Sequence, residues 1–284
     1  ALGITSAEEQ PVLPKGNNLS LHLLELFTSQ VAKVGMTDGI RQVLQEESDA
    51  LRAYYEQAGI LIARPAGGTS CRLAISAKGG TNAENHNHND VGSYAVALGS
   101  ETMVGDQGGP NSYPGDYFNG DAPQKYKIKG SFGHPVPVVD GRTQSSGGKA
   151  KGVVLQKEFT NEKDVFSIDY TSAYSTPNLD KLIRTFVYDR QGKGNFTVGD
   201  EFTAKTPIRF ETAITTRADW KVLDDTHLLL ATDSEQMIVA IDASGKVAFT
   251  SETIEVNSPA YTRIGIALKN QSKEGYIRLK MYTK

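Results

Sequence analysis

The sequence predicts a mainly β protein, an antiparallel β-sandwich preceded by two short helices. Three observations indicate this. Short apolar runs separated by turn residues recur about every ten residues from Ile60 to the C-terminus, as in sandwiches and barrels. Leucine-rich helical spacing ends at Gly59. A chain of 284 residues can bury one large β core.

The N-terminal segment reads as helical. Residues 1–16 form an extended lead-in, and helices are expected at 18–27 and 37–54. Together these two helices are too short to bury a core of their own. We therefore divide the chain into residues 1–58, a helical linker or the remnant of a larger helical domain, and residues 59–284, the β-sandwich.

The β part alternates strands with turns. Two stretches rich in Gly, Asn and Ser, 108–120 and 144–148, are expected to be loops, and the first is long enough to suggest a function. The expected strands lie at 60–63, 72–76, 94–98, 136–139, 165–170, 196–198, 237–241 and 276–281.

Charge and cysteine content exclude several classes of protein. The net charge of −3 provides no basic stripe for nucleic acid, and a polyanionic ligand would need a local basic patch. Cys71 is the only cysteine, so no intramolecular disulfide can form. No apolar run approaches the roughly 18 residues of a membrane span. No signal peptide opens the sequence, which we interpret as a processed or truncated chain.

Histidines and one aspartate form the candidate chemical site. His86 and His88 are separated by one residue, so on a strand they would share a face. Asp106 follows the next predicted strand, and His134 opens a later one. If these strands are neighbours, two imidazoles and one carboxylate could hold zinc, iron or manganese with one position open. The alternatives are solvated histidines and a polar turn built on Asn residues.

Several stretches together resemble the C-terminal β-sandwich of the heparinase II/III-like family of polysaccharide lyases. Their order and spacing agree over roughly residues 50–284. The matching stretches are 79–82, 86–94, 105–108, 133–141 and 210–213.

The resemblance implies a bacterial, commonly periplasmic enzyme that cleaves uronic-acid polysaccharides by β-elimination, with zinc as the expected metal and manganese or iron as less favoured ions. It implies that His86 reaches the substrate as a catalytic helper. It also implies that His88, Asp106 and His134 hold the zinc ion that stiffens the cleft wall, with a kink separating His86 from His88.

The same family places its catalytic Tyr and its carboxylate-neutralising residue on an N-terminal α/α toroid. Only two helix-like segments precede the sandwich here, so the chain is expected to need a toroid domain or chain as its partner, and to be inactive by itself.

Other residues beside the cluster are candidates for substrate contact. Asn85 could touch substrate, and Tyr113 and Tyr117 on the long loop could offer a phenol or stack on a sugar ring. Asp90 could orient a ligand imidazole, or could simply form a turn.

Two other classes of function stay open. One is a non-catalytic carbohydrate-binding β-sandwich with a structural metal. The other is a cupin-like metalloenzyme, whose sites also begin with His-x-His on a strand, although the Glu that cupins place shortly after that pair is missing here. The identity of the polysaccharide also stays open.

Overall fold

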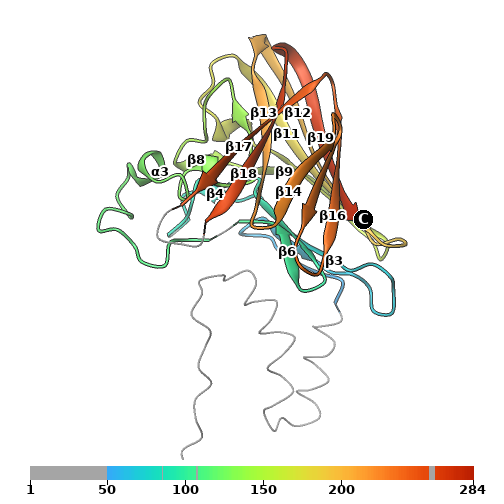
Figure 1. Ribbon diagram of the computed structural model, residues 1–284. Coiled ribbons are helices and arrows are strands. Elements are labelled where there is room, and N and C mark those ends of the chain that lie inside the picture. The colour runs from blue at the N-terminus through green and yellow to red at the C-terminus, as the bar shows by residue number, and fades with distance from the viewer. Residues whose placement is uncertain (1–49, 85, 107, 256–259) are drawn as a thin grey trace, which may run out of the picture.

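The computed structural model describes residues 50–84, 86–106, 108–255 and 260–284. The strands within these ranges form antiparallel sheets (Figure 1). The largest sheet has eight strands in the order β14-β15-β16-β19-β12-β11-β10-β9. Its strands are β9 (Val153–Phe159), β10 (Lys163–Asp169), β11 (Leu179–Asp189), β12 (Asn195–Ile208), β14 (Asp219–Asp224), β15 (His227–Ala231), β16 (Gln236–Ala243) and β19 (Ser272–Thr283).

Three smaller sheets complete the described fold. The five-stranded sheet has the order β1-β2-β3-β5-β6, the four-stranded sheet has the order β17-β18-β13-β7, and β4 pairs with β8. Their strands are β1 (Arg52–Tyr55), β2 (Ile60–Ala63), β3 (Leu73–Lys78), β4 (Thr81–Asn82), β5 (Tyr94–Leu98), β6 (Glu101–Val104), β7 (Val138–Val139), β8 (Gly147–Lys151), β13 (Phe210–Thr216), β17 (Val247–Ile254) and β18 (Tyr261–Leu268). The short helix α3 covers Ala122–Lys125, and single 3₁₀ turns cover Ser131–Gly133 and Thr171–Ala173.

The main core lies between the eight-stranded sheet and the two sheets of five and four strands. Tyr94 of β5 packs on Phe186 of β11, with ring centroids 6.2 Å apart. Phe210 of β13 stacks on Phe202 of β12 at 4.6 Å. Strict alternation of buried and half-buried residues in β3 and β5 turns one face of each strand toward this core. The predicted sandwich is therefore confirmed.

The two sheets of the second layer adjoin each other where β6 meets β13. The Thr216 hydroxyl donates to the Met103 carbonyl at 2.6 Å, and the Gly105 amide donates to the Thr215 carbonyl at 3.0 Å. A two-residue turn that begins at Gly99 (φ 60°) returns β5 into β6 and directs the chain toward this junction. These hydrogen bonds hold the end of β6 against β13 and thereby fix the position of the backbone that leads into Asp106.

Most predicted strands overlap observed ones, but the strand expected at 136–139 is reduced to Val138–Val139. Pro135 and Pro137 explain the difference, because neither has an N–H to donate to a neighbouring strand. His134 therefore follows the 3₁₀ turn at Ser131–Gly133 and does not open a strand.

The second predicted helix runs too far. Tyr54 was expected on it but lies in β1, opposite Leu61 of β2. Its ring packs on Phe159 and Phe166 of the large sheet, at 5.7 and 5.8 Å, so the sandwich recruits it. Residues 50–53 of this predicted helix are not helical either, since β1 begins at Arg52. The predicted helix at 18–27 and residues 37–49 of the second lie outside the described residues. The division at 58/59 stays a prediction, and β1 and β2 pair across it.

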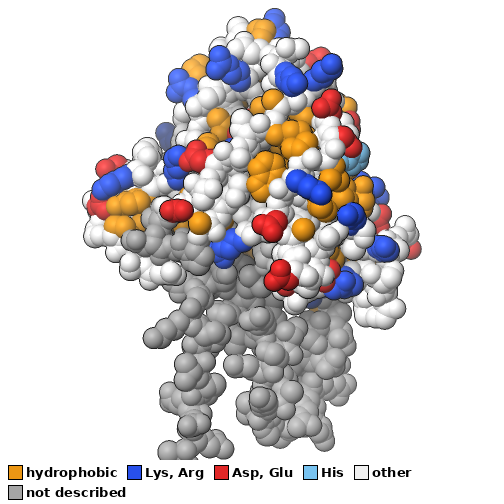
Figure 2. All heavy atoms as spheres, in the orientation of Figure 1, with side chains coloured by type: hydrophobic (Ala, Val, Ile, Leu, Met, Phe, Trp, Pro, Cys, Tyr) orange, Lys and Arg blue, Asp and Glu red, His pale blue; other side chains and the backbone are white. Residues whose placement is uncertain are grey.

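The long loop after Asp106 and helix α3 project from one side of the sandwich (Figure 1). Exposed hydrophobic side chains gather on that side among acidic and basic ones (Figure 2). Among the described residues, no helix is long and apolar enough to cross a membrane.

Candidate metal centre

His86 and His88 lie on a loop between β4 and β5, not on a strand. His86 has a φ of 59°, in the left-handed region, and the Asn87 amide closes a turn onto the Glu84 carbonyl at 3.2 Å. The expectation that both rings share one strand face is therefore wrong. The polar-turn alternative describes the backbone better, and the turn supplies a kink between the two histidines.

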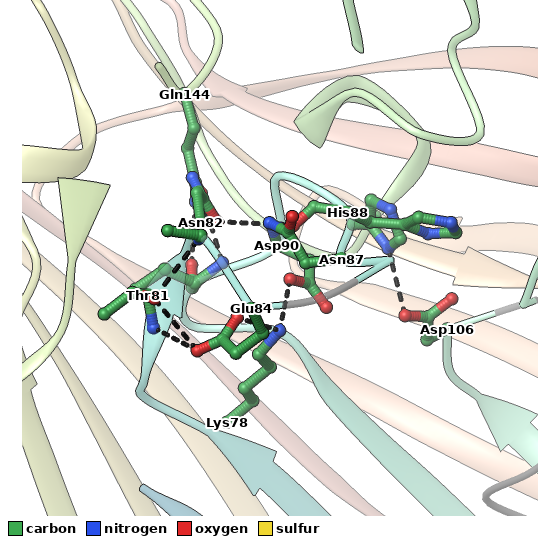
Figure 3. Close-up of polar contacts among 12 residues, drawn as sticks. Lys78, Thr81, Asn82, Glu84, Asn87, His88, Asp90, Asp106 and Gln144 are labelled. Carbon is green, nitrogen blue, oxygen red and sulfur yellow. Dashed lines mark hydrogen bonds and ion pairs between the residues drawn. The ribbon is translucent and has the colours of Figure 1, made fainter. Parts of the chain in front are cut away.

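A buried amide network fixes this loop (Figure 3). Asn82 Oδ1 accepts from the Asp90 backbone amide at 3.0 Å, and Asn82 Nδ2 donates to Gln144 Oε1, also at 3.0 Å. Gln144 Nε2 donates in turn to the Val91 carbonyl at 2.7 Å. Gln144 lies in the loop predicted at 144–148, yet it is buried and holds the histidine loop against the sandwich.

Asp90 is engaged by a lysine in this structure. Lys78 Nζ lies 2.6 Å from Asp90 Oδ1 and 3.7 Å from Glu84 Oε2. Burial lowers the pKa of Lys78, but these carboxylates outweigh burial and the net shift is upward. The proposed orienting contact between Asp90 and a ligand imidazole stays a prediction. Nothing in the sequence pattern pointed to Lys78.

Asp106 and His134 come from two different segments of the chain, one after β6 and the other after the 3₁₀ turn at Ser131–Gly133. Asp106 follows β6, as predicted, and its Oδ1 accepts from the Gly108 amide at 2.9 Å. His134 is almost fully buried, and the Tyr261 hydroxyl fixes the preceding residue by donating to the Gly133 carbonyl at 2.9 Å.

The structure brings His88, Asp106 and His134 together. One ligand atom from each lies within 4.8 Å of the other two. Asp106 Oδ2 is 3.2 Å from His134 Nδ1, and the rings of His88 and His134 have centroids 5.1 Å apart. In the part of the chain that the structure describes, neither ring nitrogen of the buried His134 makes a well-formed hydrogen bond.

The three groups perturb one another strongly. Burial, reinforced by His134, lowers the pKa of His88 to about 4, so this imidazole is neutral at ordinary pH. Burial alone would raise the pKa of Asp106 and lower that of His134. Their mutual attraction outweighs it, so the pKa of Asp106 lies below its usual range and that of His134 lies above.

This donor set fits a transition-metal ion. Two imidazoles and one carboxylate are zinc ligands, and three protein ligands leave the fourth position of a tetrahedron open. The same set suits iron or manganese. Nε2 of the buried His134 has no hydrogen-bond partner among the described residues, which is costly, and a metal ion at this imidazole would offset that cost. Closing the 4.8 Å spread to the roughly 3.3 Å expected around zinc requires only small side-chain shifts.

Aromatic rings connect this cluster to the surface. The Tyr117 hydroxyl lies 3.1 Å from His88 Nε2, while the Tyr117 ring is buried. Tyr113 and Phe118 lie outside it, about half exposed, with centroids 5.0 Å apart. The exposed His86 ring lies 4.8 Å from that of Phe118. The predicted residues Tyr113 and His86 thus lie on one surface beside the cluster, and the buried Tyr117 contacts both Tyr113 and His88.

Phe118 and Lys129 were missed by sequence reasoning. Lys129 Nζ lies 4.8 Å from the Tyr117 ring centroid and 4.9 Å from that of Phe118. Burial lowers the pKa of Lys129. Phe118 adjoins the predicted Tyr117, so the spacing of aromatics in the loop carried a usable signal. Asn85, the remaining predicted contact, lies outside the described residues.

Several solved structures that share this fold are of heparinase III and of a heparan sulfate lyase. The chain aligns with a heparinase III structure at 18% identity and a TM-score of 0.64, covering 82% of this chain and 36% of that one. It aligns with heparan sulfate lyase HepC from Pedobacter heparinus at 15% identity and a TM-score of 0.68, covering 93% and 42%. A further heparinase III structure gives 12% and 0.65.

These likenesses establish a shared fold with heparinase III lyases. No protein-family model matches the chain, and no curated protein matches its sequence. The chain spans about 36–42% of the length of the solved lyases. The match fits the predicted likeness to the C-terminal part of such enzymes. A cupin-like site, in contrast, needs its His-x-His pair on a strand, which the loop at His86 does not provide.

Proposed function

We propose that this chain is the zinc-containing β-sandwich part of a bacterial polysaccharide lyase that cleaves a uronic-acid polysaccharide by β-elimination. One observation carries the proposal: the His88–Asp106–His134 cluster opens, through Tyr117, onto a surface bearing the exposed His86, on a fold shared with heparinase III lyases.

In β-elimination a base takes the proton at C5 of the uronate, the electrons form the C4–C5 double bond, and the C4–O bond breaks. An acid then protonates the leaving oxygen. His86 is proposed to act there, because its ring is exposed and makes no hydrogen bond to another described residue. Tyr113 and Phe118 offer half-exposed ring faces beside it for the apolar face of a pyranose.

His88, Asp106 and His134 would hold the metal ion. When bound, the ion would stiffen the cleft wall by joining three segments that are distant in sequence. Zinc is proposed, with manganese or iron as less favoured ions, because the donors are two imidazoles and one carboxylate. His88 is ready for a metal because its lowered pKa keeps it neutral.

The toroid is proposed as the partner that completes the active site. The solved lyases are more than twice as long as this chain, so a large part of such an enzyme has no counterpart in it. A toroid domain or chain would contribute the catalytic Tyr and the carboxylate-neutralising residue. A polysaccharide substrate also favours a periplasmic or secreted location.

The test combines metal analysis with a lyase assay. Purified protein is expected to carry about one metal ion per chain, and His88→Ala is expected to lose it. A form carrying an α/α toroid should generate ultraviolet-absorbing unsaturated uronate from heparan sulfate, alginate or a hyaluronan-like polymer, while this chain alone should generate little. Metal-free native protein would overturn the zinc assignment, and no unsaturated product from any polymer would overturn the lyase assignment.

A non-catalytic carbohydrate-binding sandwich is the second candidate. The observation that favours it is the exposed aromatic pair Tyr113 and Phe118, which can bind a sugar without any reaction. Oligosaccharide binding by this chain, together with a toroid-bearing form that yields no unsaturated product, would support this function in place of the first.

A further inference from the structure

Arg184 is a charged side chain buried completely in the centre of the sandwich. It lies on β11 opposite Asp200 of β12. Its Nε donates to Asp200 Oδ1 at 2.7 Å, and its Nη2 donates to Asp200 Oδ2 at 2.6 Å. The hydroxyls of Tyr170 and Thr212 donate to the same carboxylate at 2.6 and 2.7 Å. The carboxylate is therefore fully hydrogen-bonded, and the charge pair is locked in one orientation.

The remaining guanidinium nitrogen reaches two other segments. Nη1 donates to the Gly92 carbonyl and to the Pro135 carbonyl, each at 2.7 Å. Gly92 ends the loop that carries His88, and Pro135 directly follows His134. A single nitrogen thus holds together the two segments that carry the imidazoles of the metal centre.

Gly92 is shaped for this contact. Its φ of 87° lies in the left-handed region, and a Cβ there would lie 3.3 Å from Tyr170 Cε2 and 3.6 Å from Arg184 Cδ. The loop backbone therefore packs directly on the Arg184 network.

The third ligand segment is tied to the same framework. Thr215 of β13 donates through its hydroxyl to the Gly105 carbonyl at 2.5 Å, next to Asp106. Thr212, on the same strand, accepts from Arg184 Nη2 at 3.1 Å. A buried charge pair adds little net stability, so stability alone does not explain Arg184. Its planar guanidinium presents several N–H donors in a rigid arrangement and can therefore hold two backbone carbonyls in place at once.

We propose that Arg184 is a positioning residue that sets the separation of His88 and His134 and thereby the affinity of the metal centre. This inference rests on the proposed metal site. Arg190 supplies a matched control, because it is also buried and paired with an aspartate, Asp164. Its guanidinium instead donates to the backbone carbonyls of Leu51 and Arg64, which lie in segments that contain none of the proposed metal ligands.

The experiment compares Arg184→Lys with Arg190→Lys. Zinc affinity is measured by competition with a chromogenic chelator, at a temperature where both variants are folded. Arg184→Lys should weaken zinc binding by about tenfold or more, as loss of a group that orients ligands does. Arg190→Lys should change it by less than about twofold, as expected for a distant site. Equal effects in the two variants would overturn the proposal.

A second measurement needs no metal. In chelated protein, the amides of Ser93 and Val136, which close turns onto the Asp90 and His134 carbonyls, should exchange hydrogen faster in Arg184→Lys but not in Arg190→Lys. If the wild type binds no zinc, the metal centre fails and this exchange comparison alone decides the role of Arg184. Unchanged exchange would refute that role. Should Arg184→Lys not fold, Thr212→Val removes the two hydrogen bonds of this hydroxyl to Arg184 and Asp200 and should show the same changes at smaller size.

Discussion

The Tyr117 hydroxyl lies 3.1 Å from Nε2 of His88, beneath the surface that carries Tyr113, Phe118 and His86. Burial raises the pKa of Tyr117, so the phenol stays protonated. If Nε2–H donates to this oxygen, the tautomer is fixed and Nδ1 keeps the lone pair that a metal ion needs. The contact would then link the substrate-facing surface to the metal centre.

Tyr117→Phe tests this assignment of the two ring nitrogens. Zinc affinity should fall roughly tenfold, because His88 loses the partner that sets its tautomer. Competition with a chromogenic chelator measures the change, with Tyr126→Phe as a control at another tyrosine of the same side, whose hydroxyl binds Asp116. Unchanged binding would mean that Tyr117 does not set the His88 tautomer, and tighter binding would mean that Nε2 faces the metal and that Tyr117 competes with it.

Removing the metal should lower thermal stability. At free zinc about 100-fold above Kd, binding adds about 2.7 kcal/mol, which corresponds to a Tm shift of roughly 5–10 °C for a chain of this size. Calorimetry with and without a chelator measures the shift. His134→Ala should abolish it, while His227→Ala, at an exposed histidine paired with Asp224, should preserve it. A chelator effect that survives in His134→Ala would place the metal elsewhere.

Zinc affinity should rise with pH. The raised pKa of His134 means that the metal-free folded protein holds this proton more tightly than the unfolded chain does. The proton's contribution to stability is fully present below the unfolded-state pKa of about 6.5 and is lost as pH rises through the folded-state pKa. Zinc must displace that proton, whereas His88, with its pKa near 4, is already neutral.

Between about pH 5 and pH 8, Kd should therefore fall by up to about tenfold per pH unit, the slope for one released proton. Titration at several pH values gives the slope. If the zinc Kd instead changed by about a hundredfold per pH unit below about pH 6.5, two protons would be released on binding, and His88 would not be neutral in the metal-free protein.

His86→Ala should separate catalysis from metal binding. The ring is exposed and packs beside Phe118, so the zinc content of the variant should match that of the wild type. In a toroid-bearing form, kcat should drop by about 10²-fold or more, as for a group that assists proton transfer. Full activity in His86→Ala would remove it from the reaction.

Phe118→Ala and Tyr113→Ala should weaken oligosaccharide binding several-fold, because each removes a half-exposed ring face. Their exposure predicts nearly unchanged Tm. Calorimetric binding to this chain measures the effect, with Val222→Ala on β14 as a control at another exposed apolar residue. Equal binding by all three variants would exclude this surface as the sugar site.

The sequence predicted strands best where burial alternates. Residues 94–98 are β5 as predicted, because alternate apolar side chains face one core and need no other information. Tyr54 shows the opposite case. Its helical spacing was local, but partners more than a hundred residues away, Phe159 and Phe166, place it in a strand.

The sequence by itself determined the fold class and the identity of the candidate ligands, since alternation and residue chemistry are local properties. It did not determine the loop at His86 or the shortened strand after His134. Only the tertiary structure placed His88, Asp106 and His134 within 4.8 Å and joined two of their segments through Arg184. The physical reason is that those contacts depend on how separate sheets pack, and no spacing along the chain encodes a distance between residues brought together across a core.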